Sequence, residues 1–369
     1  MSTPPLSLAV DATTLGPART GIENFVHHLL PPLAAAWAPG ELLLFARHPE
    51  LVAHAGPSPR VAPGGGRLWT QFRLAPALRR QRAAVFFNPI PILPLVMPLP
   101  CPAVVTVHDL HEFRRRWRYV RVLLRRTFDL AAAVIAVSEA TRQELLEAFP
   151  GLDAKVKVVH EGADAAVFHP GPATAGLLER HGVTRAPLLA VGTIQPRKNY
   201  ARMIRAYARL AAADPPPLVI VGGAGWEAEE VLALPGALGI ADRVVFTGHL
   251  ADSELGDLMR ASLMLLALST GEGFGLPVLE AMYTGLPILA SDIPPFREVA
   301  GNAARFVDPR DEAAIAARLQ GLLANPGERA EMAAAGLGRR QLFTWERTAA
   351  GIVEVLRGVA ANHPLTRSA

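Results

Sequence analysis

Short, uninterrupted apolar runs alternate with amphipathic stretches along most of the chain, and this alternation restricts the possible fold more than any other feature. Strands that are apolar at every position, not at every second one, are typical of sheets buried on both faces. A helical stretch between two such strands gives them a parallel arrangement. The sequence therefore predicts an α/β protein built from doubly wound, Rossmann-like sheets.

Strands are predicted in both halves of the chain. In the first half they are Leu6–Val10, Leu42–Phe45, Val85–Phe87, Val104–Val107, Val134–Val137 and Val156–Val159. In the second half they are Leu188–Val191, Leu218–Val221, Val244–Phe246, Leu263–Leu268, Ile288–Ala290 and Arg305–Val307. Helices are predicted at Ile22–Ala36, Glu139–Phe149 and Trp345–Val359, and a Pro/Gly-rich loop at Pro57–Gly66.

At 369 residues the chain is long enough for two domains. The stretch Ala165–Pro187, which is rich in proline and glycine, predicts a linker with a short helix. We expect a first domain over residues 1–165 and a second over 166–344, with a C-terminal helix at 345–363 that packs back on the first. Doubly wound sheets bind ligands beyond the carboxyl ends of their strands, so the loops there are the candidate functional segments.

Composition excludes several classes of protein. A single cysteine, Cys101, rules out a disulfide framework. The first residues do not resemble a signal peptide, and the longest apolar runs fall far short of the ~20 residues of a membrane-spanning helix. We therefore expect a cytoplasmic protein, at most peripheral on the inner face of the membrane. The chain has no Asp-x-Asp pair and no zinc-ligand spacing, so we expect neither a metal nor a cofactor.

One candidate loop runs from Val191 to Asn199 and carries Gly192 and the adjacent cations Arg197 and Lys198. It leads into a predicted helix at Tyr200–Leu210. A helix N-terminus with two cations beside it favours a phosphate group. The alternative is a solvated surface pair, but lysine is rare in this chain and arginine fills most of the cationic positions.

A second loop, Ser269–Glu280, follows the predicted strand Leu263–Leu268. Its glycines allow backbone amides to approach a ligand closely, and a helix is predicted to start near Leu276–Pro277. Glu272 precedes most of these glycines and Glu280 lies about one turn into the helix, so their carboxylates could reach different parts of one elongated ligand. The alternative is that Glu272 is a surface charge and Glu280 a partner of the helix dipole.

These two loops resemble segments of a known family. Glu272 and Glu280, with seven residues between them in a Gly-Phe-Gly-Leu-Pro frame, resemble the E-x7-E motif of retaining GT-B glycosyltransferases of family 4. The loop Gly192–Asn199 looks like that family's diphosphate loop, and three other segments are also similar: Val137–Thr141, Glu161–Asp164 and Phe343–Glu346. The resemblance runs from Val104 onward and implies two Rossmann-like domains facing a central cleft.

The resemblance also implies roles for residues. Arg197 and Lys198 would neutralise the donor diphosphate, Glu280 would bind the ribose, and Glu272 the transferred sugar. His108 would face the sugar from the first domain. The implied catalytic set is His108, Glu272, Arg197 and Lys198. The implied donor-binding set is Gly21, Gly192, Arg197, Lys198, Glu272, Gly273, Phe274, Gly275, Leu276 and Glu280. Thr193 departs from the family, where many members carry arginine, so Arg197 would supply that charge.

The function that the resemblance implies is transfer of a sugar from a nucleotide diphosphate donor to a glycan or lipid-linked acceptor, with retention of configuration. The chain is most similar to members of the mannosyltransferase type that build bacterial surface polysaccharides, so GDP-mannose is the first donor expected. UDP- and dTDP-sugars remain open. The alternatives are a nucleotide-sugar epimerase or hydrolase of the same fold, and a non-catalytic sugar- or membrane-binding protein.

A basic segment at His111–Leu130 carries a cluster of arginines between Arg114 and Arg126, interleaved with apolar and aromatic residues. This pattern is typical of helices that bind an anionic membrane surface. A solvated helix face is the alternative. No nucleic-acid-binding module accompanies the charges, so we expect no nucleic-acid partner.

Overall fold

The computed structural model describes residues 7–16, 21–56, 59–65, 68–111, 117–210 and 214–362, apart from the side chains of residues 117 and 118. The chain forms two compact units: Met1–Gly162 with Thr344–Ala369, and Ala163–Phe343. The first unit ends at Gly162, slightly before the predicted boundary at residue 165. At Gly162 the chain touches the C-terminal segment, since an added Cβ would lie 2.4 Å from the Trp345 nitrogen.

The first unit contains a parallel sheet in the order β3-β2-β1-β4-β5-β6-β7. Its strands are β1 Leu8–Asp11, β2 Leu42–Ala46, β3 Arg60–Pro63, β4 Val85–Asn88, β5 Ala103–Val107, β6 Ala133–Ala136 and β7 Val156–Val158. Leu8 pairs with Leu42 on one side and with Val85 on the other. The strand order therefore reverses between β1 and β4, as it does in a doubly wound sheet.

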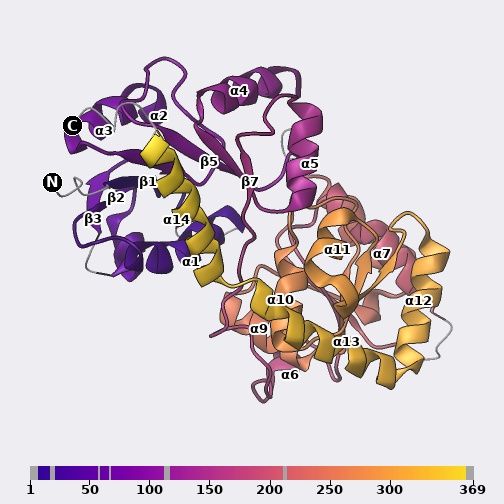
Figure 1. Ribbon diagram of the computed structural model, residues 1–369. Coiled ribbons are helices and arrows are strands. Elements are labelled where there is room, and N and C mark those ends of the chain that lie inside the picture. Colours follow the sequence, from indigo (N-terminus) through magenta and orange to yellow (C-terminus); the bar gives the residue numbers. More distant parts are fainter. Residues whose placement is uncertain are drawn as a thin grey trace. The chain divides into compact units, whose positions relative to one another are not determined.

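Helices cover both faces of this sheet (Figure 1). They are α1 Gly21–Ala35, α2 Trp69–Phe72, α3 Leu74–Gln81, α4 Trp117–Leu130, α5 Glu139–Ala148 and α14 Trp345–Asn362, with a 3₁₀ segment, η1, at Pro49–Ala55. The C-terminal helix α14 packs against α1, and its Ile352 and Leu356 are fully buried in the core that contains β1. The last helix of the chain thus belongs to the first unit.

Strand β3 corrects the prediction that Pro57–Gly66 is a loop. Three of its four residues are exposed and it ends in Pro63, so it lacks the apolar run that marks the buried strands. It pairs only with β2, at the edge of the sheet, where exposed side chains and proline are tolerated.

The second unit repeats the plan with a sheet in the order β10-β9-β8-β11-β12-β13. Its strands are β8 Leu188–Val191, β9 Leu218–Val221, β10 Val244–Gly248, β11 Met264–Ala267, β12 Ile288–Ser291 and β13 Ala304–Val307. Its helices are α6 Leu177–Arg180, α7 Tyr200–Ala208, α8 Ala228–Ala237, α9 Asp252–Ala261, α10 Leu276–Thr284, α11 Pro294–Ala300, α12 Glu312–Ala324 and α13 Pro326–Arg339; η3 spans Pro196–Lys198. The order reverses between β8 and β11, which brings the two candidate loops side by side.

The prediction of two doubly wound, Rossmann-like sheets is therefore confirmed. None of the helices in the described ranges combines the length and the apolar character that crossing a membrane would require.

Candidate functional site

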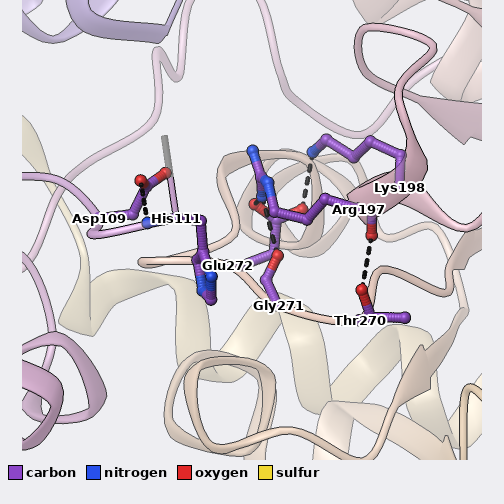
Figure 2. Close-up of polar contacts among 7 residues, drawn as sticks. All are labelled: Asp109, His111, Arg197, Lys198, Thr270, Gly271 and Glu272. Carbon is purple, nitrogen blue, oxygen red and sulfur yellow. Dashed lines mark hydrogen bonds and ion pairs between the residues drawn. The ribbon is translucent and has the colours of Figure 1, made fainter. Parts of the chain in front are cut away.

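Two loops of the second unit meet at the point where its strand order reverses. The loop after β8 passes through η3 into α7, and the loop after β11 leads into α10. The backbone N–H of Thr270 donates to the Arg197 carbonyl (2.8 Å), and Arg197 Nη1 donates to the Gly271 carbonyl (2.8 Å). Figure 2 shows this junction. The loops thus form one structural element although more than 70 residues separate them in sequence.

The carboxylate of Glu272 lies between the two cations predicted to bind phosphate. Lys198 Nζ donates to Oε1 at 2.7 Å, and Arg197 Nη1 donates to Oε2 (Figure 2). All three side chains are largely buried: Lys198 is 13% exposed, Arg197 is 21% exposed and Glu272 is 10% exposed. Burial raises the pKa of Glu272, but the two cations outweigh it and hold the pKa at about 2. The cluster therefore carries a net positive charge.

Asn199 fixes the end of the cationic loop. Its Nδ2 donates to the Leu268 carbonyl (3.0 Å) and to the Pro309 carbonyl (2.8 Å), and the side chain is buried. Its φ of 61° lies in the left-handed region, which asparagine tolerates better than most residues. Because Asn199 directly follows Lys198, these bonds hold the backbone from which the lysine side chain extends. The sequence motif contained Asn199, but its role was not predicted.

The loops after β8 and β9 touch backbone to backbone. Gly222 has a φ of 148°, and a Cβ there would lie 2.1 Å from the Gly192 carbonyl oxygen. Only glycine fits at position 222 in this contact. Gly192, on the other side of the contact, lies next to the Lys198 side chain. Sequence analysis missed Gly222, although a cluster of glycines directly after a predicted strand was the available signal.

The second loop ends at the start of α10. Gly275, at the N-cap position with a φ of 108°, lies against the Phe296 ring, where a Cβ would come within 2.7 Å of a ring carbon. Phe274 is buried, and Leu276 is the first helical residue. An α-helix N-terminus favours negative charge, and here it lies directly after Gly273, Phe274 and Gly275, which belong to the implied donor-binding set.

Glu280 differs from Glu272 in its electrostatic environment. It lies on α10, and burial together with the charge of Asp252, the first residue of α9, raises its pKa to about 8 despite the opposing effect of Lys198. At neutral pH Glu280 is mainly protonated and can both donate and accept a hydrogen bond. The two carboxyl groups of the motif therefore differ in protonation state in the ligand-free protein at neutral pH.

The first unit holds the remaining predicted residues. His108 follows β5, and its Nδ1 lies 2.8 Å from Glu161 Oε1 while its Nε2 lies 3.0 Å from the Pro89 carbonyl oxygen. Gly21 is the exposed first residue of α1, whereas Thr20 lies outside the described residues. Next to His108, the Asp109 carboxylate accepts a hydrogen bond from the His111 N–H at 2.9 Å (Figure 2). The pairing of His108 with Glu161 was not predicted.

A small cavity of about 10 Å³ lies behind the ion pairs, lined by Lys198, Tyr200, Ser269 and Glu272 among others. A volume of this size holds about one water molecule. Within the described ranges, no group of three or more His, Cys, Asp or Glu side chains is arranged to hold a metal ion.

Comparison with known proteins identifies the family. The model described as "Glycosyl transferases group 1" matches residues 180–339, and the one described as "Glycosyltransferase Family 4" matches residues 19–167. The chain is 30% identical over 352 residues to the D-inositol 3-phosphate glycosyltransferase of Nocardioides sp. (strain ATCC BAA-499 / JS614), covering 89% of this chain and 74% of that protein. The chain belongs to glycosyltransferase family 4.

This glycosyltransferase is also 29% identical over 318 residues to O-antigen chain mannosyltransferase B of Escherichia coli, covering 83% of this chain and 80% of the relative. The chain spans about half of the length of several other curated relatives that are also named D-inositol 3-phosphate glycosyltransferase. Among solved structures, Anabaena HepE in complex with UDP and glucose matches with a TM-score of 0.77 at 20% identity, over 95% of this chain and 99% of that one. That likeness shows the GT-B fold.

Proposed function

We propose that this glycosyltransferase moves a sugar from a nucleoside diphosphate donor to a glycan or lipid-linked acceptor and retains the anomeric configuration. One observation carries the proposal: Arg197 and Lys198 converge on a single anionic group at the point where the strand order of the second unit reverses. In the structure that anion is the Glu272 carboxylate. A diphosphate offers the same kind of oxygen acceptors to the same two donors.

The two cations would act on the leaving group. As the bond between the anomeric carbon and the phosphate oxygen breaks, negative charge grows on the diphosphate, and Arg197 and Lys198 stabilise it. Removal of one such preorganised contact typically costs about 10²–10³ in rate. The acceptor hydroxyl then attacks from the face that the phosphate leaves, and the phosphate takes its proton. These cations supply the charge that a metal ion provides elsewhere, so we expect activity without added metal.

Glu272 would change partners during donor binding. Its carboxylate currently occupies both cations, so an incoming diphosphate must share or replace those contacts. The carboxylate then becomes available to accept hydrogen bonds from sugar hydroxyls, which is the role implied by the motif. Glu280, with its proton, would bind the ribose hydroxyls.

Mannose from GDP-mannose is the first donor to test, because the relative from Escherichia coli is named as an O-antigen chain mannosyltransferase. That name also supports a role in surface polysaccharide synthesis. We propose that the enzyme works at the inner face of the membrane. The experiment incubates the enzyme with GDP-mannose, UDP-glucose or dTDP-rhamnose and a glycan acceptor, with and without EDTA, and determines the product anomer by NMR. Inversion of configuration, or consumption of donor without an acceptor, would contradict the proposal.

Helix α4 is the proposed contact with an anionic membrane that carries the acceptor. Tyr119 and Val122 are 83% and 69% exposed, and Leu123, Arg126 and Leu130 are also exposed. An apolar face beside a cation suits the interface of anionic lipids. Two arginines of the predicted basic segment bond to backbone carbonyls at and just after the C-terminus of α5: Arg121 to Ala148 (3.1 Å) and Arg125 to Pro150 (2.9 Å). Arg114–Arg116 lie outside the described residues.

Co-sedimentation with vesicles that contain phosphatidylglycerol tests this contact. We expect the wild-type enzyme to bind at low salt and a Tyr119→Ser, Val122→Ser variant to lose most of the binding. Leu232→Ser, which changes an exposed apolar residue of α8 in the second unit, is the matched control and should bind like the wild type. Equal binding of all three proteins, or no binding of the wild type, would contradict the proposal.

A further inference from the structure

Both ring nitrogens of His108 face hydrogen-bond acceptors. Nε2 lies 3.0 Å from the Pro89 carbonyl oxygen, which can only accept. Nδ1 lies 2.8 Å from Glu161 Oε1, and an ionised carboxylate also only accepts. Satisfying both contacts requires a hydrogen on each nitrogen. The geometry thus favours an imidazolium ring, which has no lone pair with which to take a proton.

Glu161 is held firmly in this position. It follows β7 and is almost completely buried. On one side, the His160 carbonyl accepts a hydrogen bond from Thr348 Oγ1 at 2.8 Å. On the other side, Gly162 lies so close to the backbone of Trp345 that no side chain fits there. Thr348 and Trp345, at the start of α14, therefore hold the backbone on both sides of Glu161 and keep its carboxylate next to His108.

Two charged groups act on the imidazole, namely Glu161 and Asp109. The imidazole also contacts two uncharged groups, the Pro89 carbonyl and the Phe25 ring of α1, whose centroid lies 4.7 Å from that of His108 in an edge contact. Burial by itself lowers the pKa of His108. The hydrogen bond and charge of Glu161, with smaller contributions from Pro89 and Asp109, outweigh burial and hold the pKa above its ordinary value.

We propose that Glu161 is a positioning residue that keeps His108 doubly protonated and its ring fixed, so that His108 acts as a cation and not as a general base. The use of this cation in the reaction rests on the proposed function, whereas its protonation does not. A fixed cation fits a reaction in which the departing phosphate accepts the proton of the acceptor. The fourth residue of the implied catalytic set would then contribute charge, as Arg197 and Lys198 do.

The test uses Glu161→Gln, which keeps the size of the side chain and its capacity to hydrogen-bond but removes the charge. Nitrogen-15 NMR of the histidine rings follows the protonation of both His108 nitrogens. In the wild type we expect both to stay protonated at pH 7, and in Glu161→Gln we expect the midpoint to fall by about one pH unit or more. Glu50→Gln, which alters the exposed His48–Glu50 pair (3.4 Å), is the matched control and should leave His108 unchanged.

Activity supplies the second measurement. The kcat/KM of Glu161→Gln should fall as pH rises through the lowered midpoint and recover towards the wild-type value at lower pH. A purely structural role would lower kcat/KM equally at every pH, and that result would overturn the proposal. A neutral His108 at pH 7 in the wild-type NMR spectrum would also overturn it, even if Glu161→Gln failed to fold. Because the NMR titration needs neither donor nor acceptor, it separates this proposal from the proposed function.

Discussion

Replacing Glu272 by glutamine should destabilise the ligand-free protein although it leaves the shape of the site nearly unchanged. The carboxylate is 10% exposed and pairs with both Arg197 and Lys198. Its pKa falls from 4.5 to about 2 on folding. A shift of this size corresponds to about 3 kcal/mol of stability at pH 7. The variant loses this contribution and leaves two cations beside each other in a partly buried site.

The pH dependence of this effect follows from the direction of the shift. The pKa of Glu272 is lower in the folded state than in the unfolded chain, where it is 4.5. The ion pairs of Glu272 therefore stabilise the fold fully above pH 4.5, and this stabilisation is lost as the pH falls through about 2. The difference in the free energy of unfolding between wild type and Glu272→Gln should therefore shrink from about 3 kcal/mol at pH 7 to roughly half of that at pH 3. Urea denaturation of both proteins at pH 7 and pH 3 measures this difference in the free energy of unfolding. Glu230→Gln, at an exposed ion pair with Arg205, should match the wild type.

The same substitution should strengthen the binding of a simple anion. In the wild type, inorganic pyrophosphate competes with the Glu272 carboxylate for Arg197 and Lys198, and in the variant this competitor is neutral. Pyrophosphate should therefore raise the melting temperature of Glu272→Gln by more than that of the wild type, since ligand stabilisation grows with affinity. Equal stability of the two proteins at pH 7, or a smaller pyrophosphate effect in the variant, would refute the reasoning.

Substitutions of three other residues, two of them with a comparison variant, test single features of the second unit. Asn199→Ala should cost about 2–4 kcal/mol in urea denaturation because it removes two buried hydrogen bonds and strains the left-handed backbone, whereas Asn199→Gly should cost less because it avoids the strain. Glu280→Gln should gain stability over the wild type as the pH rises from 4.5, the pKa in the unfolded chain, to about 8, the raised pKa in the folded protein; a constant difference between pH 5 and 9 would contradict that value. Gly222→Ala should prevent folding of the second unit, seen by circular dichroism, while Gly223→Ala, which has open space around it, should fold normally.

The sequence was sufficient to predict the sheets because their strands are buried on both faces and their helices lie between them. Each strand predicted from an apolar run is present, and within the described residues its ends differ from the prediction by two residues at most; Leu6 lies outside those residues. Strand β3 was missed since it is stabilised by pairing with β2 and not by burial of its own side chains. An edge strand of this kind leaves little signal in the hydrophobic pattern.

The candidate site was predictable only in part. The loops that carry Arg197, Lys198 and Glu272 could be recognised one at a time, and the strand order explains why they meet. Contacts between residues far apart in sequence were not predictable from local patterns. The bond of Arg197 to the Gly271 carbonyl and the pairing of His108 with Glu161 are of this kind. They depend on the exact register of the loops, which spacing and composition do not determine.

The central claim is that Lys198, with Arg197, binds the diphosphate of the donor. Calorimetric titration of the wild type and of Lys198→Met with GDP, UDP and the corresponding nucleosides tests it most directly. We expect one diphosphate to bind much more tightly than its nucleoside, and Lys198→Met to weaken that binding by about ten- to a hundredfold, the value of a hydrogen bond to a charged group. Nucleoside binding as tight as diphosphate binding, or an unchanged affinity in Lys198→Met, would contradict the account.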